Sequence, residues 1–203
     1  MRRSQIGLLV LGACNKRSVT AALERADART LDILQREDLE RVDAVIFPGV
    51  ANVGYVARAL DHGGLRTPLG DAIRGGLPLL GICAGFQMLF EHSDEDRDVT
   101  GLGVFRGNVE ALRGPKRLHM GWNRVAPLTA NMPEGWAYFA HGFAAPANAD
   151  GVIATTRFGS STFASVSRGG SVTGVQFHPE RSGAYGQAFL QQFVDAARGA
   201  YAG

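Results

Sequence analysis

The chain has 203 residues and a formal net charge of +2, with 45% hydrophobic and 20% charged residues. This length and composition suit an ordinary globular protein with a substantial core, and they predict a single domain over residues 1–203. Scattered basic residues argue against nucleic-acid binding, and no run approaches the roughly 20 apolar residues of a membrane-spanning helix.

The first half of the chain alternates between apolar runs and helical patterns. Runs without period-two alternation predict buried parallel strands at residues 6–11, 44–47 and 77–82. Helices are expected at residues 19–26, behind a cap at Ser18, and at 53–60, 69–73 and 84–90. This order predicts an α/β fold with a central, mostly parallel sheet flanked by helices.

The second half has shorter segments that are rich in turn residues. Strands are expected at residues 108–112, 137–140, 152–156, 162–166 and 172–177, several of them in antiparallel pairs. Gly169-Gly170 is typical of a hairpin turn. An amphipathic helix over residues 185–197 closes the chain, so an antiparallel portion is expected to follow the parallel one.

Cysteine usage limits the setting and the chemistry. Cys14 and Cys83 are the two cysteines, which is too few for a zinc cluster, and we expect neither a metal nor a cofactor. Reduced cysteines and a cytoplasmic location suit a chain with this core. The apolar run at residues 6–11 is too short for a signal peptide and is interpreted as the buried first strand.

Cys83 has the surroundings of a nucleophile. It follows an apolar run and lies between Gly81 and Gly85, ahead of a helical pattern. A nucleophile on a sharp strand-to-helix turn is held in a strained conformation that flanking glycines permit. The helix start favours the thiolate, and the Ala84 N–H is placed to donate to an oxyanion. A buried core cysteine is the alternative, but the two glycines favour the nucleophile.

A base and its orienting group follow near the end of the chain. His178 ends an expected strand, and Pro179 stops the strand pairing. Residues two apart in extended chain project to the same side, so Glu180 can hold the imidazole while His178 takes the thiol proton. Cys83, His178 and Glu180 are therefore predicted to form a catalytic triad. Gln87, one helical turn after Cys83, can hold a small substrate against the sulfur.

These segments resemble the class I (triad) glutamine amidotransferases. The resemblance narrows to the glutaminase subunit of imidazole glycerol phosphate synthase, whose motifs occur in the same order from about residue 12 onward. The segments that carry it are Asn15–Val19, Gly81–Gln87, His119–Asn123, Tyr138–His141 and Gln176–Gly183. The Met-Gly-Trp-Asn stretch discriminates best, because other triad amidotransferases lack it.

The resemblance implies a fold and an activity. The fold would be that of the class I amidotransferases, and glutamine would be hydrolysed through a thioester on Cys83. Ammonia would pass through a channel to a separate (β/α)8-barrel synthase subunit in histidine biosynthesis. The implied glutamine-binding residues are Gly49, Ala51, Gln87, His141, Gly142 and Phe143. The implied partner-interface residues are Asn15, Trp122, Asn123, Tyr138 and Arg181, with core packing as the alternative for Trp122 and Tyr138.

The chain departs from the family pattern near the oxyanion site. The resemblance makes the Val50 N–H the second oxyanion donor, turned inward when the partner's ligand binds. Ala51 stands where the family has glycine, which accepts positive φ freely, so a peptide flip there is harder. Gly142-Phe143 replaces Ser-Tyr.

These departures keep several functions open. One alternative is a paralogue that supplies ammonia to a different synthase. Another is a non-catalytic regulatory subunit of the same fold. A stand-alone cysteine hydrolase would share the nucleophile turn, but it would not explain the Met-Gly-Trp-Asn stretch.

Overall fold

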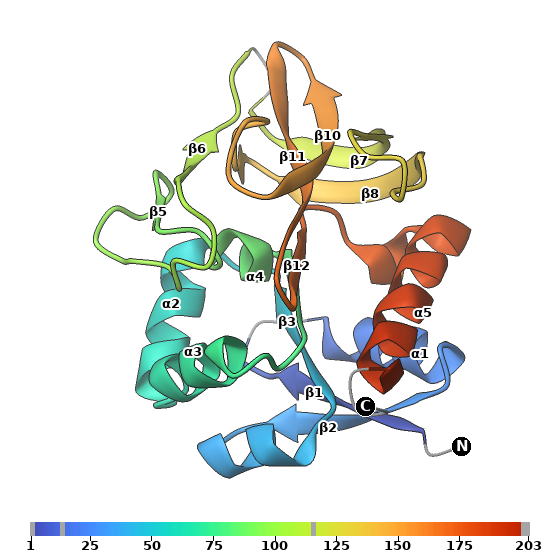
Figure 1. Ribbon diagram of the computed structural model, residues 1–203. Coiled ribbons are helices and arrows are strands. Elements are labelled where there is room, and N and C mark those ends of the chain that lie inside the picture. Colours follow the sequence, from blue (N-terminus) through green and yellow to red (C-terminus); the bar gives the residue numbers. More distant parts are fainter. Residues whose placement is uncertain (1–2, 13–14, 115–116, 200–203) are drawn as a thin grey trace.

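The computed structural model describes residues 3–12, 15–114 and 117–199 (Figure 1). The first half contains, in chain order, β1 (Ser4–Leu9), α1 (Lys16–Arg25), β2 (Ala28–Ile33), η1 (Arg36–Arg41), β3 (Ala44–Gly49), α2 (Val53–His62), α3 (Arg66–Arg74), β4 (Leu79–Cys83) and α4 (Ala84–Gln87). The second half contains β5 (His92–Ser93), β6 (Asn108–Ala111), β7 (His119–Pro127), β8 (Gly135–His141), β9 (Phe143–Ala144), β10 (Val152–Phe158), β11 (Ser161–Gly169), β12 (Val172–Val175), η2 (Pro179–Arg181) and α5 (Gly183–Gly199).

One nine-stranded sheet, in the order β2-β1-β3-β4-β12-β11-β10-β7-β8, runs through both halves of the chain. Its first five strands are mutually parallel, and β11, β10, β7 and β8 continue it in antiparallel fashion. The sheet is therefore mixed, parallel in its first part and antiparallel in its second, as predicted. A small sheet of β5, β6 and β9 lies beside it.

Helices cover both faces of the parallel part, because its strands are apolar on both sides. Figure 1 shows α1 and α5 on one side and α2, α3 and α4 on the other. Val19 and Leu23 of α1 and Leu190 of α5 share one core cluster with Ile6 and Leu8 of β1. A second cluster joins α2 and α3 to the opposite side of the sheet. No helix among the described residues has the length and apolar character needed to span a membrane.

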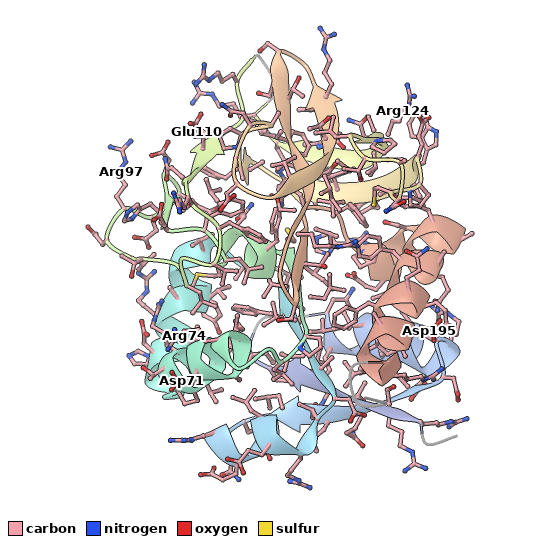
Figure 2. The ribbon with its side chains drawn as sticks, viewed as in Figure 1. Asp71, Arg74, Arg97, Glu110, Arg124 and Asp195 are labelled. Carbon is pink, nitrogen blue, oxygen red and sulfur yellow. The ribbon has the colours of Figure 1, made fainter. Side chains whose placement is uncertain are left out.

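Charged side chains stay at the periphery of this arrangement. Figure 2 shows Asp71, Arg74, Arg97, Arg124 and Asp195 pointing away from the ribbon. Several form exposed ion pairs, such as that between Arg74 and Asp71 on α3, and pairs of this kind contribute little to stability. The core and the site are therefore determined mainly by apolar packing and buried hydrogen bonds.

Most predicted elements are confirmed, with four corrections. Ser18 does not cap α1: the cap residue is Asn15, and Ser18 lies inside the first turn. The helix expected over residues 84–90 ends at Gln87, because the chain turns after a single helical turn. Four strands were not predicted: the edge strand β2, the partly polar strand β7, and the two-residue strands β5 and β9. The predicted hairpin between β11 and β12 is present, but its turn residues are Gly170 and Ser171, because Gly169 ends β11 and pairs with Val172; Gly170 has φ 56°.

Candidate functional site

Cys83 lies at the turn between β4 and α4 and has a strained backbone. Its φ is 54° and its ψ is −112°, a region that side chains other than glycine rarely adopt. The neighbouring glycines allow the close packing that holds this turn. A Cβ atom on Gly85 would lie 1.8 Å from the Phe47 carbonyl oxygen, and one on Gly49 would lie 2.6 Å from the Ala84 Cβ. The predicted sharp strand-to-helix turn is present.

His178 reaches Cys83 because β12 pairs with β4. Val175 at the end of β12 lies opposite Ile82, the residue before Cys83. Three residues further on, His178 Nδ1 lies 3.0 Å from Glu180 Oε1, and both side chains are buried. The three predicted triad residues therefore meet at the carboxyl end of two adjacent parallel strands.

The electrostatics of this cluster favour a charged imidazole. Burial opposes the imidazolium, but the charge of the Cys83 sulfur, its hydrogen bond to His178 and the Glu180 carboxylate together raise the pKa of His178 to about 10. His178 is thus protonated at neutral pH, and an imidazolium favours a thiolate beside it. The arrangement can supply a nucleophilic sulfur, a general acid and base, and a carboxylate that fixes the ring.

A buried serine holds the turn that carries the base. Ser182 Oγ donates to the His178 carbonyl oxygen at 2.6 Å and accepts from the Tyr138 N–H at 2.9 Å. The Tyr138 carbonyl oxygen in turn accepts from the His178 N–H at 2.9 Å. The backbone of His178 is therefore hydrogen-bonded to β8 both directly and through Ser182.

Gln176 is a site residue that was not predicted from the sequence. Its side chain is fully buried, its Nε2 lies 3.7 Å from the Cys83 sulfur, and its Oε1 accepts from Gln87 Nε2 at 3.2 Å. The only signal in the sequence is its position two residues before His178. Because residues two apart in extended chain project to the same side, the Gln176 and His178 side chains both point toward Cys83.

The predicted glutamine-binding residues come from three segments that meet near β4 and α4. Gly49 is the register partner of Cys83. Gln87 Nε2 donates to the Phe143 carbonyl oxygen at 2.7 Å, and His141 Nδ1 lies 2.9 Å from the same oxygen. Gly142 accepts through its carbonyl oxygen from Leu112.

The predicted oxyanion segment follows directly after Gly49. Val50 is half exposed, Ala51 is partly buried, and neither has a positive φ. Asn52 Oδ1 accepts from the Tyr55 N–H, and Glu95 accepts from the Val53 N–H. The segment thus ends in a firmly capped helix α2, so any peptide rotation is confined to the residues before Asn52. Ala84, the other predicted donor, begins α4.

Three of the five predicted interface residues form one cluster. Trp122 on β7 and Tyr138 on β8 are register partners whose rings meet edge to face, and the Arg181 guanidinium lies 4.0 Å from the centre of the Tyr138 ring. Asn123 faces the other side of β7, with its side chain bonded to His119 and to the Arg157 carbonyl oxygen. Asn15, the cap residue of α1, is more than 100 positions before Trp122 in the sequence and belongs to a different part of the fold. Cys14, interpreted as structural, lies outside the described residues.

Comparison with known proteins places this geometry in a family. A family model described as glutamine amidotransferase class-I matches residues 4–197. The chain belongs to that family.

Curated relatives of this amidotransferase agree over nearly the full length. The protein named imidazole glycerol phosphate synthase subunit HisH of Geobacillus kaustophilus is 37% identical over 96% of this chain and 98% of its own length. The protein of the same name from Deinococcus radiodurans is 39% identical over 93% of this chain and 92% of its own.

Solved structures share the fold at low sequence identity. A crystal structure of a glutamine amidotransferase covers 95% of this chain and 98% of its own, with a TM-score of 0.78 and 22% identity. The structure of PurLQS from Thermotoga maritima matches with a TM-score of 0.72 and 17% identity, over 96% of this chain and 99% of that one. At these identities the likeness shows the fold alone.

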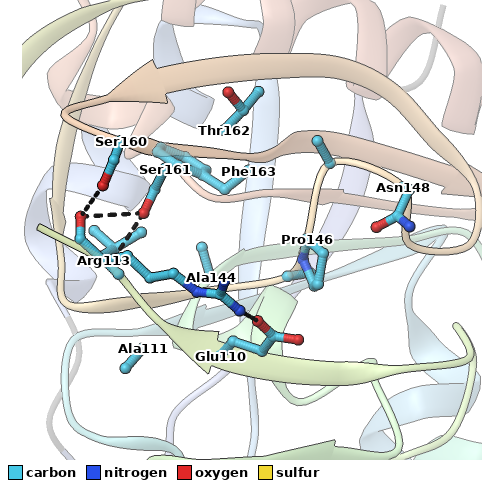
Figure 3. Close-up of a pocket in the computed structure, with 13 residues that line it drawn as sticks. Glu110, Ala111, Arg113, Ala144, Pro146, Asn148, Ser160, Ser161, Thr162 and Phe163 are labelled. Carbon is cyan, nitrogen blue, oxygen red and sulfur yellow. Dashed lines mark hydrogen bonds and ion pairs between the residues drawn. The ribbon is translucent and has the colours of Figure 1, made fainter.

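A cavity of about 370 Å³ lies apart from the triad, between β6, residues 144–148 and β11. Figure 3 shows Glu110 and Arg113 paired on one side of it and Ser160 and Ser161 bonded to the Arg113 carbonyl oxygen. No triad residue lines it. Within the part of the amidotransferase that the structure describes, no group of three or more His, Cys, Asp or Glu side chains could hold a metal ion.

Proposed function

We propose that this amidotransferase is a glutaminase that releases ammonia from glutamine, with Cys83 as its nucleophile. The observation that carries the proposal is the strained Cys83 turn, at φ 54°, with the buried His178–Glu180 pair beside it. A strained nucleophile is retained where the surrounding structure holds it for function. Membership of the class-I family names glutamine as the substrate.

The chemistry follows from the positions of these groups. The Cys83 thiolate attacks the side-chain carbonyl carbon of glutamine, and the N–H groups of Ala84 and Val50 stabilise the oxyanion. His178 donates its proton to the departing ammonia, leaving a thioester on Cys83. His178 then takes a proton from water, which attacks the thioester and releases glutamate and the thiolate. Glu180 keeps the imidazole oriented in both steps.

A (β/α)8-barrel synthase subunit is the proposed acceptor of the ammonia. The 37–39% identity to relatives named as subunits of imidazole glycerol phosphate synthase supports this proposal, and the role proposed for the ammonia is in histidine biosynthesis. The outer face of β7 and β8 offers a docking surface, because Met120, Trp122 and Trp136 are 64%, 54% and 60% exposed there. Large exposed apolar side chains next to an arginine are typical of a protein interface. A cytoplasmic location stays a prediction from cysteine usage.

A glutaminase assay with and without the barrel subunit and its ligand tests the proposal. Ammonia release is expected to be slow for the isolated chain and to rise when both are added. A glutamine-mimicking electrophile should label Cys83 and abolish the activity. Cys83→Ala is the matched inactive variant, and unchanged glutamine hydrolysis by that variant would falsify the proposal.

The departure at Ala51 supports a second candidate, a paralogue that serves another synthase. The two candidates share the glutaminase chemistry and differ in the partner. Complementation of a strain that lacks the histidine-pathway glutaminase separates them, since only the first restores growth without histidine. Thioester formation with labelled glutamine would in addition argue against a non-catalytic regulatory subunit.

A further inference from the structure

Two buried histidines, His119 and His141, lie side by side, and His141 is itself one of the implied glutamine-binding residues. His119 Nδ1 is 3.2 Å from His141 Nε2, and their side chains come from the paired strands β7 and β8. The His119 ring stacks between Phe139 and Phe158, with ring centres 4.7 and 4.2 Å away. The proposed reaction uses neither imidazole as an acid or base, so their pairing calls for a separate explanation.

Asn123 determines which nitrogen of His119 carries the proton. Its Oδ1 accepts from the Arg124 N–H at 2.7 Å, and its Nδ2 donates to the Arg157 carbonyl oxygen at 3.0 Å. The same Nδ2 lies 3.1 Å from His119 Nε2. Because an amide nitrogen only donates, His119 Nε2 must accept, and the ring proton is on Nδ1.

The hydrogen bond of His141 runs in the same donor-to-acceptor direction. The Phe143 carbonyl oxygen only accepts, so His141 carries its proton on Nδ1, 2.9 Å away. His141 Nε2 is then free to accept from His119 Nδ1. A further proton on either ring would place two donors face to face. Burial lowers the pKa of His119 to about 4 and that of His141 to about 3, which agrees with two neutral rings.

The chain of hydrogen bonds continues from Phe143 to the sulfur. Gln87 Nε2 donates to the Phe143 carbonyl oxygen at 2.7 Å and to Gln176 Oε1 at 3.2 Å, so both of its amide hydrogens are engaged. Gln176 Nε2 lies 3.7 Å from the Cys83 sulfur. The Gln87 amide is thereby oriented with its Oε1 available to a substrate N–H.

We propose that Asn123, His119 and His141 are positioning residues for the glutamine pocket. They form a one-directional series of hydrogen bonds that fixes the Phe143 carbonyl oxygen and, through it, the Gln87 amide. The proposal rests on the glutaminase function proposed above. It assigns the two imidazoles a fixed neutral state and no part in proton transfer.

His119→Phe tests the proposal by kinetics. The substitution keeps an aromatic ring between Phe139 and Phe158 but removes the donor to His141 and the acceptor for Asn123. Losing both hydrogen bonds loosens the Phe143 carbonyl oxygen and the Gln87 amide, which predicts a KM for glutamine about fivefold higher, equivalent to about 1 kcal/mol of binding free energy. The kcat should change by less than roughly twofold, because uniform binding is lost rather than transition-state binding. Phe158→Leu is the control: it disturbs the same stack, leaves the hydrogen bonds in place, and should keep the wild-type KM.

A spectroscopic measurement on the wild-type protein tests the direction of the chain without any variant. Long-range ¹⁵N–¹H NMR of the imidazole rings at pH 7 should show His119 and His141 both neutral and both protonated on Nδ1. A proton on Nε2 of either ring, or a charged ring, would overturn the proposal.

The outcomes separate this proposal from the function on which it rests. Wild-type protein that hydrolyses no glutamine with its barrel partner would overturn both. Wild-type protein that is active, together with a His119→Phe variant that folds and keeps the wild-type KM, would overturn the positioning proposal alone. If His119→Phe does not fold, the NMR tautomers still decide.

Discussion

Replacing Gln176 by leucine isolates the contribution of the amide next to the nucleophile. Leucine has a similar volume and no polar atoms, and the position is fully buried. The change removes the Nε2 donor that lies 3.7 Å from the Cys83 sulfur. It also removes the acceptor of one Gln87 hydrogen, while the other stays bonded to the Phe143 carbonyl oxygen.

The size of the effect follows from these two contacts. A hydrogen bond to a charged group contributes about 1.5–3 kcal/mol, and the contact to sulfur belongs at the lower end. About 1.4 kcal/mol corresponds to tenfold, so the rate at which Cys83 is alkylated at neutral pH should fall by up to about tenfold. The unpaired Gln87 hydrogen should lower the free energy of unfolding by roughly 1–3 kcal/mol.

Alkylation by iodoacetamide at neutral pH, followed at the Cys83 peptide by mass spectrometry, measures the first effect. Urea titration measures the second. Gln192→Leu, at an exposed position on α5, is the matched control and should change neither. A folded Gln176→Leu protein that is alkylated at the wild-type rate would show that the amide does not stabilise the thiolate.

Three further predictions concern other parts of the site. Ser182→Ala leaves the Tyr138 N–H without its acceptor, and urea titration should show a loss of roughly 1–3 kcal/mol; an unchanged midpoint would contradict this. Burial lowers the pKa of His119 to about 4 and that of His141 to about 3, below the 6.5 of the unfolded state. Their neutral rings therefore contribute stability above pH 6.5 that is lost as the pH falls toward 4 and 3. Urea titrations at pH 7 and pH 5 should show a smaller decrease in the free energy of unfolding for His119→Phe than for wild type. Ala51→Gly should raise the unstimulated glutaminase rate roughly tenfold, since positive φ costs a residue other than glycine about 1–2 kcal/mol. A rate equal to wild type would show that rotation of the peptide between residues 50 and 51 does not limit the unstimulated reaction.

Local patterns predicted much of the parallel half, and polar strands were missed. The strands β1, β3 and β4 are continuous apolar runs, because both of their faces are buried. The edge strand β2 carries Arg29 and Asp32, and its single covered face leaves no continuous apolar run. Strand β7 was missed because its inner face carries the polar residues His119 and Asn123, some of whose hydrogen-bond partners lie on other strands.

The triad could be predicted because each part has a local signature. Cys83 has its glycines, and His178 and Glu180 are two residues apart. Gln176 has no such signature, since its partners Gln87 and Cys83 are 89 and 93 positions away. The hydrogen bonds of Asn123 also depend on strand pairing that spacing does not reveal. The cap of α1 was misplaced because Asn15 and Ser18 are both good cap residues by type.

The position of β12 has a consequence for the order in which the molecule is made. This strand, Val172–Val175, pairs with β4 on one side and with β11 on the other, and His178 follows it. While the chain emerges from the ribosome, β4 is an open sheet edge and the Cys83 sulfur has no imidazole beside it. The two can meet only after the chain through His178 has been made. The reactive thiolate is therefore assembled only after β12 and His178 have been made, and chains cut before β12 carry an unactivated cysteine.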